Sequence, residues 1–140
     1  MVHALKQVHR ILRPNGLLVN IQPLPIPHSI EVHSVETVTK VGWLTDQTDF
    51  ASERSSFNAL AQVVAEGYFM LEDEQEFNFN VYGVNLNEFQ EWLAEWWGSA
   101  IFPQRTIQRV EEIYQEADHS TRVVLIDPVR MTKLRAVWLE

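Results

Sequence analysis

The sequence predicts an α/β protein in which a mixed, partly antiparallel sheet of about four or five strands is packed by helices. Two observations favour this fold class. Apolar residues recur at helical spacing in four stretches, and β-branched and aromatic residues are concentrated in short runs between those stretches. Proline, glycine and asparagine stand at several of the boundaries, as they do in turns between helices and strands.

The chain begins with a predicted helix, turn and strand. An apolar stripe predicts a helix over residues 2–12, with His9 on its polar face. Pro14 ends the helix, and Gly16 is expected to take the left-handed conformation that closes the turn. Leu17–Gln22 then runs without charge and without strict alternation, which predicts a strand covered by helices on both faces.

A hairpin and a second helix are expected next. Ile30–His33 and Val38–Leu44 predict the hairpin, with Trp43 packed on its inner face. The segment Asp46–Asp49 breaks the strand pattern and is expected to supply a helix N-cap. The helix itself is predicted over Phe50–Glu66, where apolar residues recur at helical spacing.

A long strand carrying a block of acidic residues follows. Tyr68–Tyr82 alternates in places between apolar and polar residues, which indicates an antiparallel strand. Its acidic run, Glu72–Glu76, matches no calcium-binding loop and is expected to be a solvated, charged segment. The cations of a later strand, Arg130, Lys133 and Arg135, are expected to pair with this run rather than to bind phosphate.

Two further helices and two β runs complete the chain. Asn85–Trp97 is a strong helix prediction, because Asn85 can cap it and Glu88 stands three residues further on. Pro103 suits the first turn of another helix. The final β runs, Arg122–Ile126 and Val129–Val137, are joined by Asp127-Pro128, where proline indicates an edge position or a bulge.

Composition excludes several classes of function. The net charge of −8 argues against sequence-independent binding of nucleic acid, which needs clustered cations. No apolar run approaches the ~20 residues that span a bilayer, and no signal peptide opens the chain, so we expect no membrane association and a cytoplasmic protein. The chain has no cysteine, its five histidines lack metal-ligand spacing, and no nucleophile elbow occurs, so no catalytic or metal-binding residue is assigned. At 140 residues, a single domain over residues 1–140 is expected.

The opening segment ALKQVHRILRPNGLLVNI resembles a helix–turn–strand of class I S-adenosylmethionine-dependent methyltransferases. In that family a helix ending in a Leu-x-Pro-Gly-Gly turn leads into the fifth strand of a Rossmann-like sheet, and Asn15 stands where the first glycine is usual. The resemblance extends thinly over most of the chain and implies a partial Rossmann-like methyltransferase fold. It further implies that residues 68–82 and 121–138 form the antiparallel pair that closes the sheet.

The cofactor-binding part of that family has no counterpart in these residues. The family holds S-adenosylmethionine with a Gly-rich loop after the first strand and with an acidic residue that ends the second strand. The five glycines of this chain are too far apart to form such a loop. We therefore expect that the chain alone binds no S-adenosylmethionine and catalyses no methylation.

Two functions fit this pattern. In the first, which we favour, the chain is a methyltransferase-like protein, catalytically incomplete alone, whose cofactor-binding half lies on a separate polypeptide or was lost upstream. The position of Met1, just before a mid-domain helix, fits an internal start or a split gene. In the second, the chain is a non-enzymatic oligomeric protein for binding or assembly, derived from the same fold. An upstream reading frame encoding a strand and a Gly-rich loop would favour the first.

Five residues are candidates for a pocket or an interface. In complete methyltransferases the segment after the matching strand lies near the substrate, so Gln22 and His28 could line a pocket; the alternative is a surface loop. Three tryptophans in one helix form either a core face or an aromatic pocket or interface. These are Trp92, Trp96 and Trp97.

The predicted first strand also suggests assembly. Without the rest of a methyltransferase sheet, Leu17–Gln22 would be left with an unpaired, uncharged edge, and natural proteins rarely leave such an edge bare. A homodimer or higher oligomer is therefore expected. The alternative is a monomer in which the hairpin Ile30–Leu44 folds back onto this edge.

Overall fold

The computed structural model of the chain describes residues 1–83, 85–117 and 119–139. Four helices and six strands occur in these residues, and no described helix is long and apolar enough to cross a membrane. The helices are α1 (Val2–Ile11), α2 (Ala51–Ala65), α3 (Leu86–Trp96) and α4 (Gln104–Gln115). The strands are β1 (Leu17–Pro23), β2 (His28–His33), β3 (Val38–Asp46), β4 (Phe69–Gly83), β5 (Ala100–Ile101) and β6 (Arg122–Ala136).

The strands follow the order β1–β6–β2–β3–β5, and β4 also pairs with β6. The α/β class is confirmed, and each predicted helix is present to within a few residues. The prediction of a mixed sheet is wrong, because every pairing with an assigned register is antiparallel and no parallel pairing occurs among the described residues. Antiparallel strands can be joined by a short turn, as β2 and β3 are, whereas parallel strands need a long crossover.

The chain divides into two compact units, each built from separate stretches of sequence. Unit 1 contains Met1–Pro25, Ala51–Phe77 and Val129–Glu140, and unit 2 contains Ile26–Phe50 and Asn78–Pro128. The strands β4 and β6 each contribute residues to both units. The expectation of a single domain over residues 1–140 stays a prediction.

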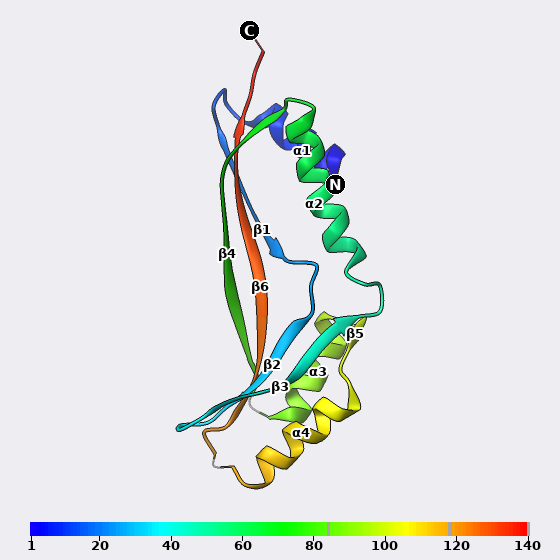
Figure 1. Cartoon of the computed structure of the whole chain (residues 1–140). Coiled ribbons are helices and arrows are strands. Elements are labelled where there is room, and N and C mark those ends of the chain that lie inside the picture. Colours follow the sequence, from blue (N-terminus) through cyan, green and yellow to red (C-terminus); the bar gives the residue numbers. More distant parts are fainter. Residues whose placement is uncertain (84, 118, 140) are drawn as a thin grey trace. The chain divides into compact units, whose positions relative to one another are not determined.

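In unit 1, the helices α1 and α2 lie on one face of the strands β1, β6 and β4 (Figure 1). The core between them is apolar and includes Leu5 of α1, Val63 of α2 and Leu134 of β6. The turn that connects α1 to β1 is closed by Asn15, whose φ is +62°. The prediction that Gly16 takes the left-handed conformation is therefore wrong, and asparagine is one of the few other residues that adopt it readily.

The side chain of His9 belongs to the core of unit 1 rather than to the polar face of α1. His9 is 7% exposed, and its Nε2 donates a hydrogen bond to the carbonyl oxygen of Val137 at 2.7 Å. The ring stacks on Trp138, with 4.6 Å between the centroids. Helical spacing places a residue on a face of its own helix, but it contains no information about a carbonyl supplied from 128 residues further along the chain.

In unit 2, the helices α3 and α4 pack against the hairpin formed by β2 and β3 (Figure 1). The core includes Ile30, Leu44 and Phe89, all almost fully buried. The predicted cap of α3 is confirmed, because the side-chain oxygen of Asn85 accepts a hydrogen bond from the backbone N–H of Glu88 at 2.9 Å.

The strand β6 is continuous, although the sequence predicted two β runs. Its partner changes along its length, from β2 as far as Ile126 to β1 from Val129 onwards. Asp127 and Pro128 fall between these two registers. Proline lacks the N–H that a strand ladder needs, and it is tolerated here because the ladder changes partner at this point.

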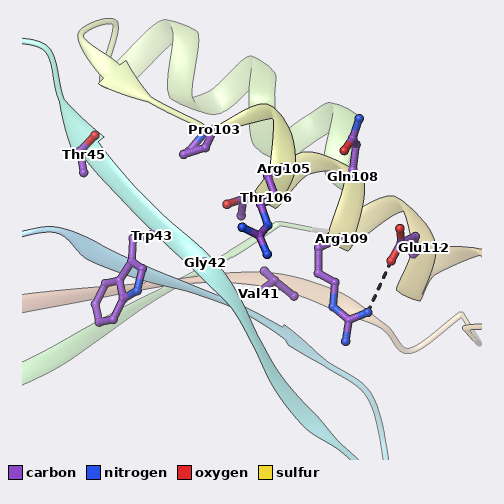
Figure 2. Close-up of a pocket in the computed structure, with 10 residues that line it drawn as sticks. All are labelled: Val41, Gly42, Trp43, Thr45, Pro103, Arg105, Thr106, Gln108, Arg109 and Glu112. Carbon is purple, nitrogen blue, oxygen red and sulfur yellow. Dashed lines mark hydrogen bonds and ion pairs between the residues drawn. The ribbon is translucent and has the colours of Figure 1, made fainter.

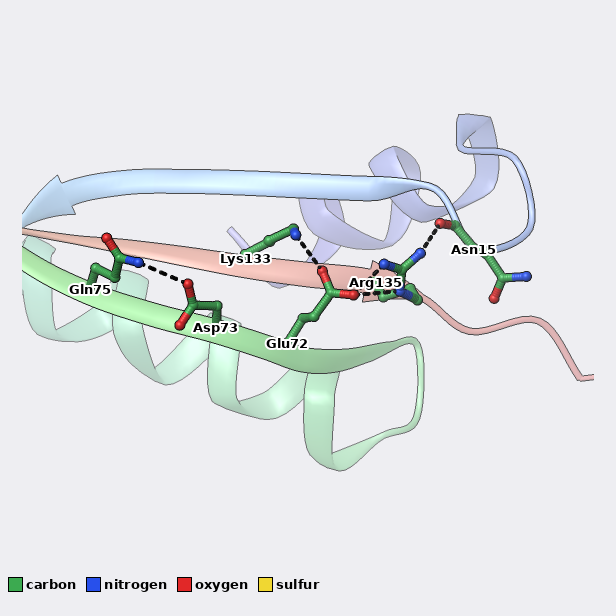
Figure 3. Close-up of polar contacts among 6 residues, drawn as sticks. All are labelled: Asn15, Glu72, Asp73, Gln75, Lys133 and Arg135. Carbon is green, nitrogen blue, oxygen red and sulfur yellow. Dashed lines mark hydrogen bonds and ion pairs between the residues drawn. The ribbon is translucent and has the colours of Figure 1, made fainter.

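Cross-strand ion pairs join β4 and β6 in unit 1, as the sequence predicted. Glu72 accepts hydrogen bonds from Arg135 and makes an ion pair with Lys133 at 2.8 Å (Figure 3). Arg130 pairs with Glu76 at 2.6 Å. These side chains are partly exposed to solvent, so each pair contributes little to stability and serves mainly to fix which residues face each other.

Gly42 of β3 is needed because α4 passes too close for a side chain. A Cβ at this position would overlap Thr106 of α4, lying 2.8 Å from its Cγ2 and closer still to its Oγ1. We expect Gly42→Ala to lower the free energy of unfolding by about 2 kcal/mol, as overpacking typically does. Urea unfolding measures it. The double variant Gly42→Ala/Thr106→Ala should recover much of the stability that Gly42→Ala alone loses. If the losses of the two single variants simply added in the double variant, the proposed overlap would be contradicted.

Candidate functional site

The five candidate residues lie in several places. Gln22 is in β1 and belongs to unit 1. Trp92 packs against the core of unit 2, and Trp96 is 71% exposed. His28 and Trp97 are in contact, with 4.9 Å between their ring centroids. The structure therefore gathers two of the five candidates into one cluster, in unit 2.

His28 is the centre of this cluster. It is the first residue of β2 and is 4% exposed, so the surface-loop alternative does not describe it. Its ring stacks on the ring of Phe50, with 5.8 Å between the centroids, and its Nδ1 lies 3.6 Å from a carboxylate oxygen of Asp127. An imidazole beside a carboxylate can hold and exchange a proton. Within the described residues, no group of three or more His, Asp or Glu side chains is arranged to hold a metal ion.

Asp46, at the end of β3, fixes Trp97 in this cluster. Its carboxylate accepts hydrogen bonds from the indole N–H of Trp97 and the hydroxyl of Ser99, both at 2.6 Å. It also accepts from the backbone N–H of Thr48, at 2.7 Å, and from the hydroxyl of Thr48. Burial by itself raises the pKa of Asp46, but the hydrogen bonds from Ser99, Thr48 and Trp97 outweigh it and hold the pKa well below its usual range.

The sequence did not indicate this role for Asp46. It placed Asp46 in a segment expected to cap a helix, whereas the carboxylate binds side chains 51 and 53 residues further along the chain. The available signal was weak: a carboxylate and an indole are both polar groups that need partners when they are buried. The pairing itself depends on the tertiary fold.

An open groove with a volume of about 680 Å³ lies between β3 and α4 in unit 2 (Figure 2). Arg105 and Arg109 of α4 line it, and the guanidinium of Arg109 lies 3.4 Å from Glu112. Trp43 lines the same groove. It is 48% exposed, so the prediction that it packs on the inner face of the hairpin is wrong. The ammonium of Lys40 lies 3.7 Å from its ring centroid and covers part of the indole.

The outer face and the free edge of β1 form an apolar exposed surface of unit 1. Leu17, Val19 and Ile21 are 44%, 51% and 58% exposed, so the prediction that helices cover both faces of β1 is wrong. The helices α1 and α2 both lie on the opposite face (Figure 1). Because β1 is the last strand in the order, its second edge has no partner strand among the described residues.

Neither device that could shield this edge is present. The β2–β3 hairpin pairs with β6, so the alternative in which it folds back onto β1 is wrong. Residues Leu17–Gln22 carry no charge and no proline, which are the usual means of protecting an edge strand, and the one proline of β1, Pro23, is its last residue. The nearest charges on the outer face, Lys133 and Arg135, are already paired with Glu72 (Figure 3). A second β-strand is therefore the natural partner for this edge.

Comparisons of the chain with protein-family models, curated proteins and solved structures return no match. The function therefore has to be inferred from the geometry of the chain itself.

Proposed function

We propose that this chain is a methyltransferase-like protein that is catalytically incomplete alone and receives a β-strand from another chain along the edge of β1. The free, uncharged edge of β1, together with its exposed outer side chains Leu17, Val19 and Ile21, carries the proposal. An edge of this kind is covered in natural proteins, because its unpaired N–H and C=O groups and apolar side chains otherwise promote aggregation.

The arrangement around β1 supports the methyltransferase-like assignment. A helix, a Pro-Asn-Gly turn and a strand occur in the order that the resemblance implies, as α1 and β1. The two long strands that should close the sheet are β4 and β6, which pair with each other, and β6 lies between β1 and β4. In a complete methyltransferase the other side of the strand matching β1 is taken by the cofactor-binding half, and here that side is open.

The partner that supplies the strand is either a second copy of this chain or a separate polypeptide carrying the cofactor-binding half. A separate half would bring S-adenosylmethionine with it, and the assembly would be an enzyme. A second copy would cover the edge without providing a cofactor site. In that case the chain would be an oligomeric binding or assembly protein, which is the second candidate function and is favoured by the same exposed edge.

We expect the chain alone not to bind S-adenosylmethionine. Without a Gly-rich loop and a ribose-binding carboxylate the cofactor loses several hydrogen bonds, each worth ~1–3 kcal/mol when charged groups take part. Isothermal titration calorimetry measures the affinity, with a complete class I methyltransferase as the positive control. A dissociation constant below about 100 µM, or −5.5 kcal/mol, would contradict the proposal.

A further inference from the structure

The helix-facing side of the β1–β6 pair changes from apolar to polar along its length. Directly opposed residues of an antiparallel pair point to the same face. Leu18 lies opposite Leu134, and both belong to or pack against the core of unit 1. The next two inward-facing pairs are Asn20 with Thr132 and Gln22 with Arg130. Four polar side chains therefore follow one another where an apolar core would be expected to continue.

Three of these side chains contain buried polar atoms that lack a hydrogen-bond partner among the described residues. They are the amide nitrogens of Asn20 and Gln22 and the hydroxyl of Thr132. Thr132 is 4% exposed. Leaving such a group without a partner costs about 1–3 kcal/mol, and in natural proteins an explanation is usually found in a bound molecule or a function.

A cavity of about 510 Å³ lies between α2 and the strands β4 and β6. Its size is within the range of sites that bind small molecules. Thr132 lines it, and most of the remaining lining is aliphatic or aromatic. These apolar residues are Phe57, Leu60, Ala61, Val64, Ala65, Leu71 and Leu134.

The charges of the cavity are balanced. Arg130 is the one cation of its lining, and it pairs with Glu76 at 2.6 Å and lies 4.0 Å from Glu74, which is also part of the lining. The guanidinium also lies 5.1 Å from the ring centroid of Phe57. With its cation already neutralised, the cavity offers no free charge to an ionic ligand, whereas the hydroxyl of Thr132 can donate a hydrogen bond.

We propose that this cavity binds an uncharged acyl compound, an amide or an ester with an alkyl chain. The carbonyl oxygen accepts a hydrogen bond from the hydroxyl of Thr132, the one side chain that both lines the cavity and has a buried polar atom without a partner among the described residues. The alkyl chain lies along the apolar side chains of α2. This inference is independent of the proposed methyltransferase-like function, because it uses neither the edge of β1 nor a cofactor.

Titration calorimetry with decanamide tests the proposal on the full chain. We expect a dissociation constant below about 100 µM. Thr132→Val should weaken binding about tenfold, the effect of one hydrogen bond, and should leave the unliganded chain at least as stable, since it removes an unpartnered hydroxyl. Ala61→Phe should abolish binding by filling the cavity, because Ala61 is exposed and part of the lining.

Thr121→Val is the matched control. The hydroxyl of Thr121 is also buried without a partner among the described residues, but it belongs to unit 2. The control should bind decanamide as the unmodified chain does. Decylamine and decanoate should bind at least tenfold more weakly than decanamide. Absence of decanamide binding, equal binding by Thr132→Val, or tighter binding of either ion would overturn the proposal.

Discussion

Asp46→Ala is expected to lower the free energy of unfolding by about 3 kcal/mol. The carboxylate is 9% exposed and accepts four hydrogen bonds, from Trp97, Ser99 and twice from Thr48. Its removal leaves buried donors without an acceptor, which costs more than the net value of the bonds. Urea unfolding at neutral pH measures the loss.

Asp73→Ala is the control for this change. Asp73 is exposed, and its carboxylate accepts a hydrogen bond from Gln75 at 3.1 Å. It should change the free energy of unfolding by less than about 0.5 kcal/mol, as is usual for exposed positions. If Asp46→Ala and Asp73→Ala lowered the free energy of unfolding equally, the hydrogen bonds of Asp46 would not be the source of the stabilisation.

The same carboxylate should make stability depend on pH in the acid range. The folded chain holds the pKa of Asp46 below its ordinary value of 3.8. A group with a lowered folded pKa stabilises the fold above its unfolded pKa, and this contribution is lost as the pH falls through about 4 towards the folded pKa. The difference in unfolding free energy between the unmodified chain and Asp46→Asn should therefore shrink below about pH 4. A difference that grew on acidification would contradict this sign.

Val19→Lys is expected to weaken self-association by at least about a hundredfold, the largest effect on assembly. In an antiparallel pair of β1 strands related by a two-fold axis near Val19, the two lysines would face each other, and like charges directly opposed are destabilising. Val19 is 51% exposed, so the fold of each chain should tolerate the change. Sedimentation equilibrium measures the dissociation constant.

Val35→Lys is the matched control, because Val35 is 76% exposed and belongs to unit 2. It introduces the same charge at an apolar exposed position of the other unit, and it should leave the dissociation constant within about threefold of the unmodified value. Equal weakening by both substitutions would indicate a general effect of charge rather than an interface at β1.

Local signals in the sequence predicted most of the helices and strands. The capping pattern of Asn85 and Glu88 gave the start of α3, and the alternation in Tyr68–Tyr82 gave β4. The pairing of acidic residues in β4 with Arg130 and Arg135 was also predictable, because opposite charges concentrate on two segments that had to be neighbouring strands. These features depend on neighbouring residues or on charge, which a sequence displays directly.

Features that depend on distant residues were not predictable. The burial of His9 depends on a carbonyl from the end of the chain, and the role of Asp46 depends on Trp97 and Ser99. The apolar sequence of β1 suggested burial on both faces, yet apolar content alone does not say how many faces are covered. The result is an exposed outer face at Val19.

The candidate site was predictable in part. His28 and Trp97 were named from the sequence and lie in contact, whereas Phe50 of the same cluster was assigned only to a helix. The cavity beside Thr132 left no sequence signal, because a threonine in a strand is ordinary. The burial of the Thr132 hydroxyl without a partner among the described residues depends on how β1, β6 and α2 pack together.

Light scattering on a size-exclusion column tests the central claim, that the edge of β1 takes a strand from another chain, most directly. When this chain is alone in solution, a second copy is the one available donor of a strand. We expect, at micromolar concentration, a particle with twice the 16.3 kDa mass of one chain, or a higher multiple. A mass of 16.3 kDa would show that β1 is stable as a bare edge and would contradict the proposal that a strand from another chain covers it.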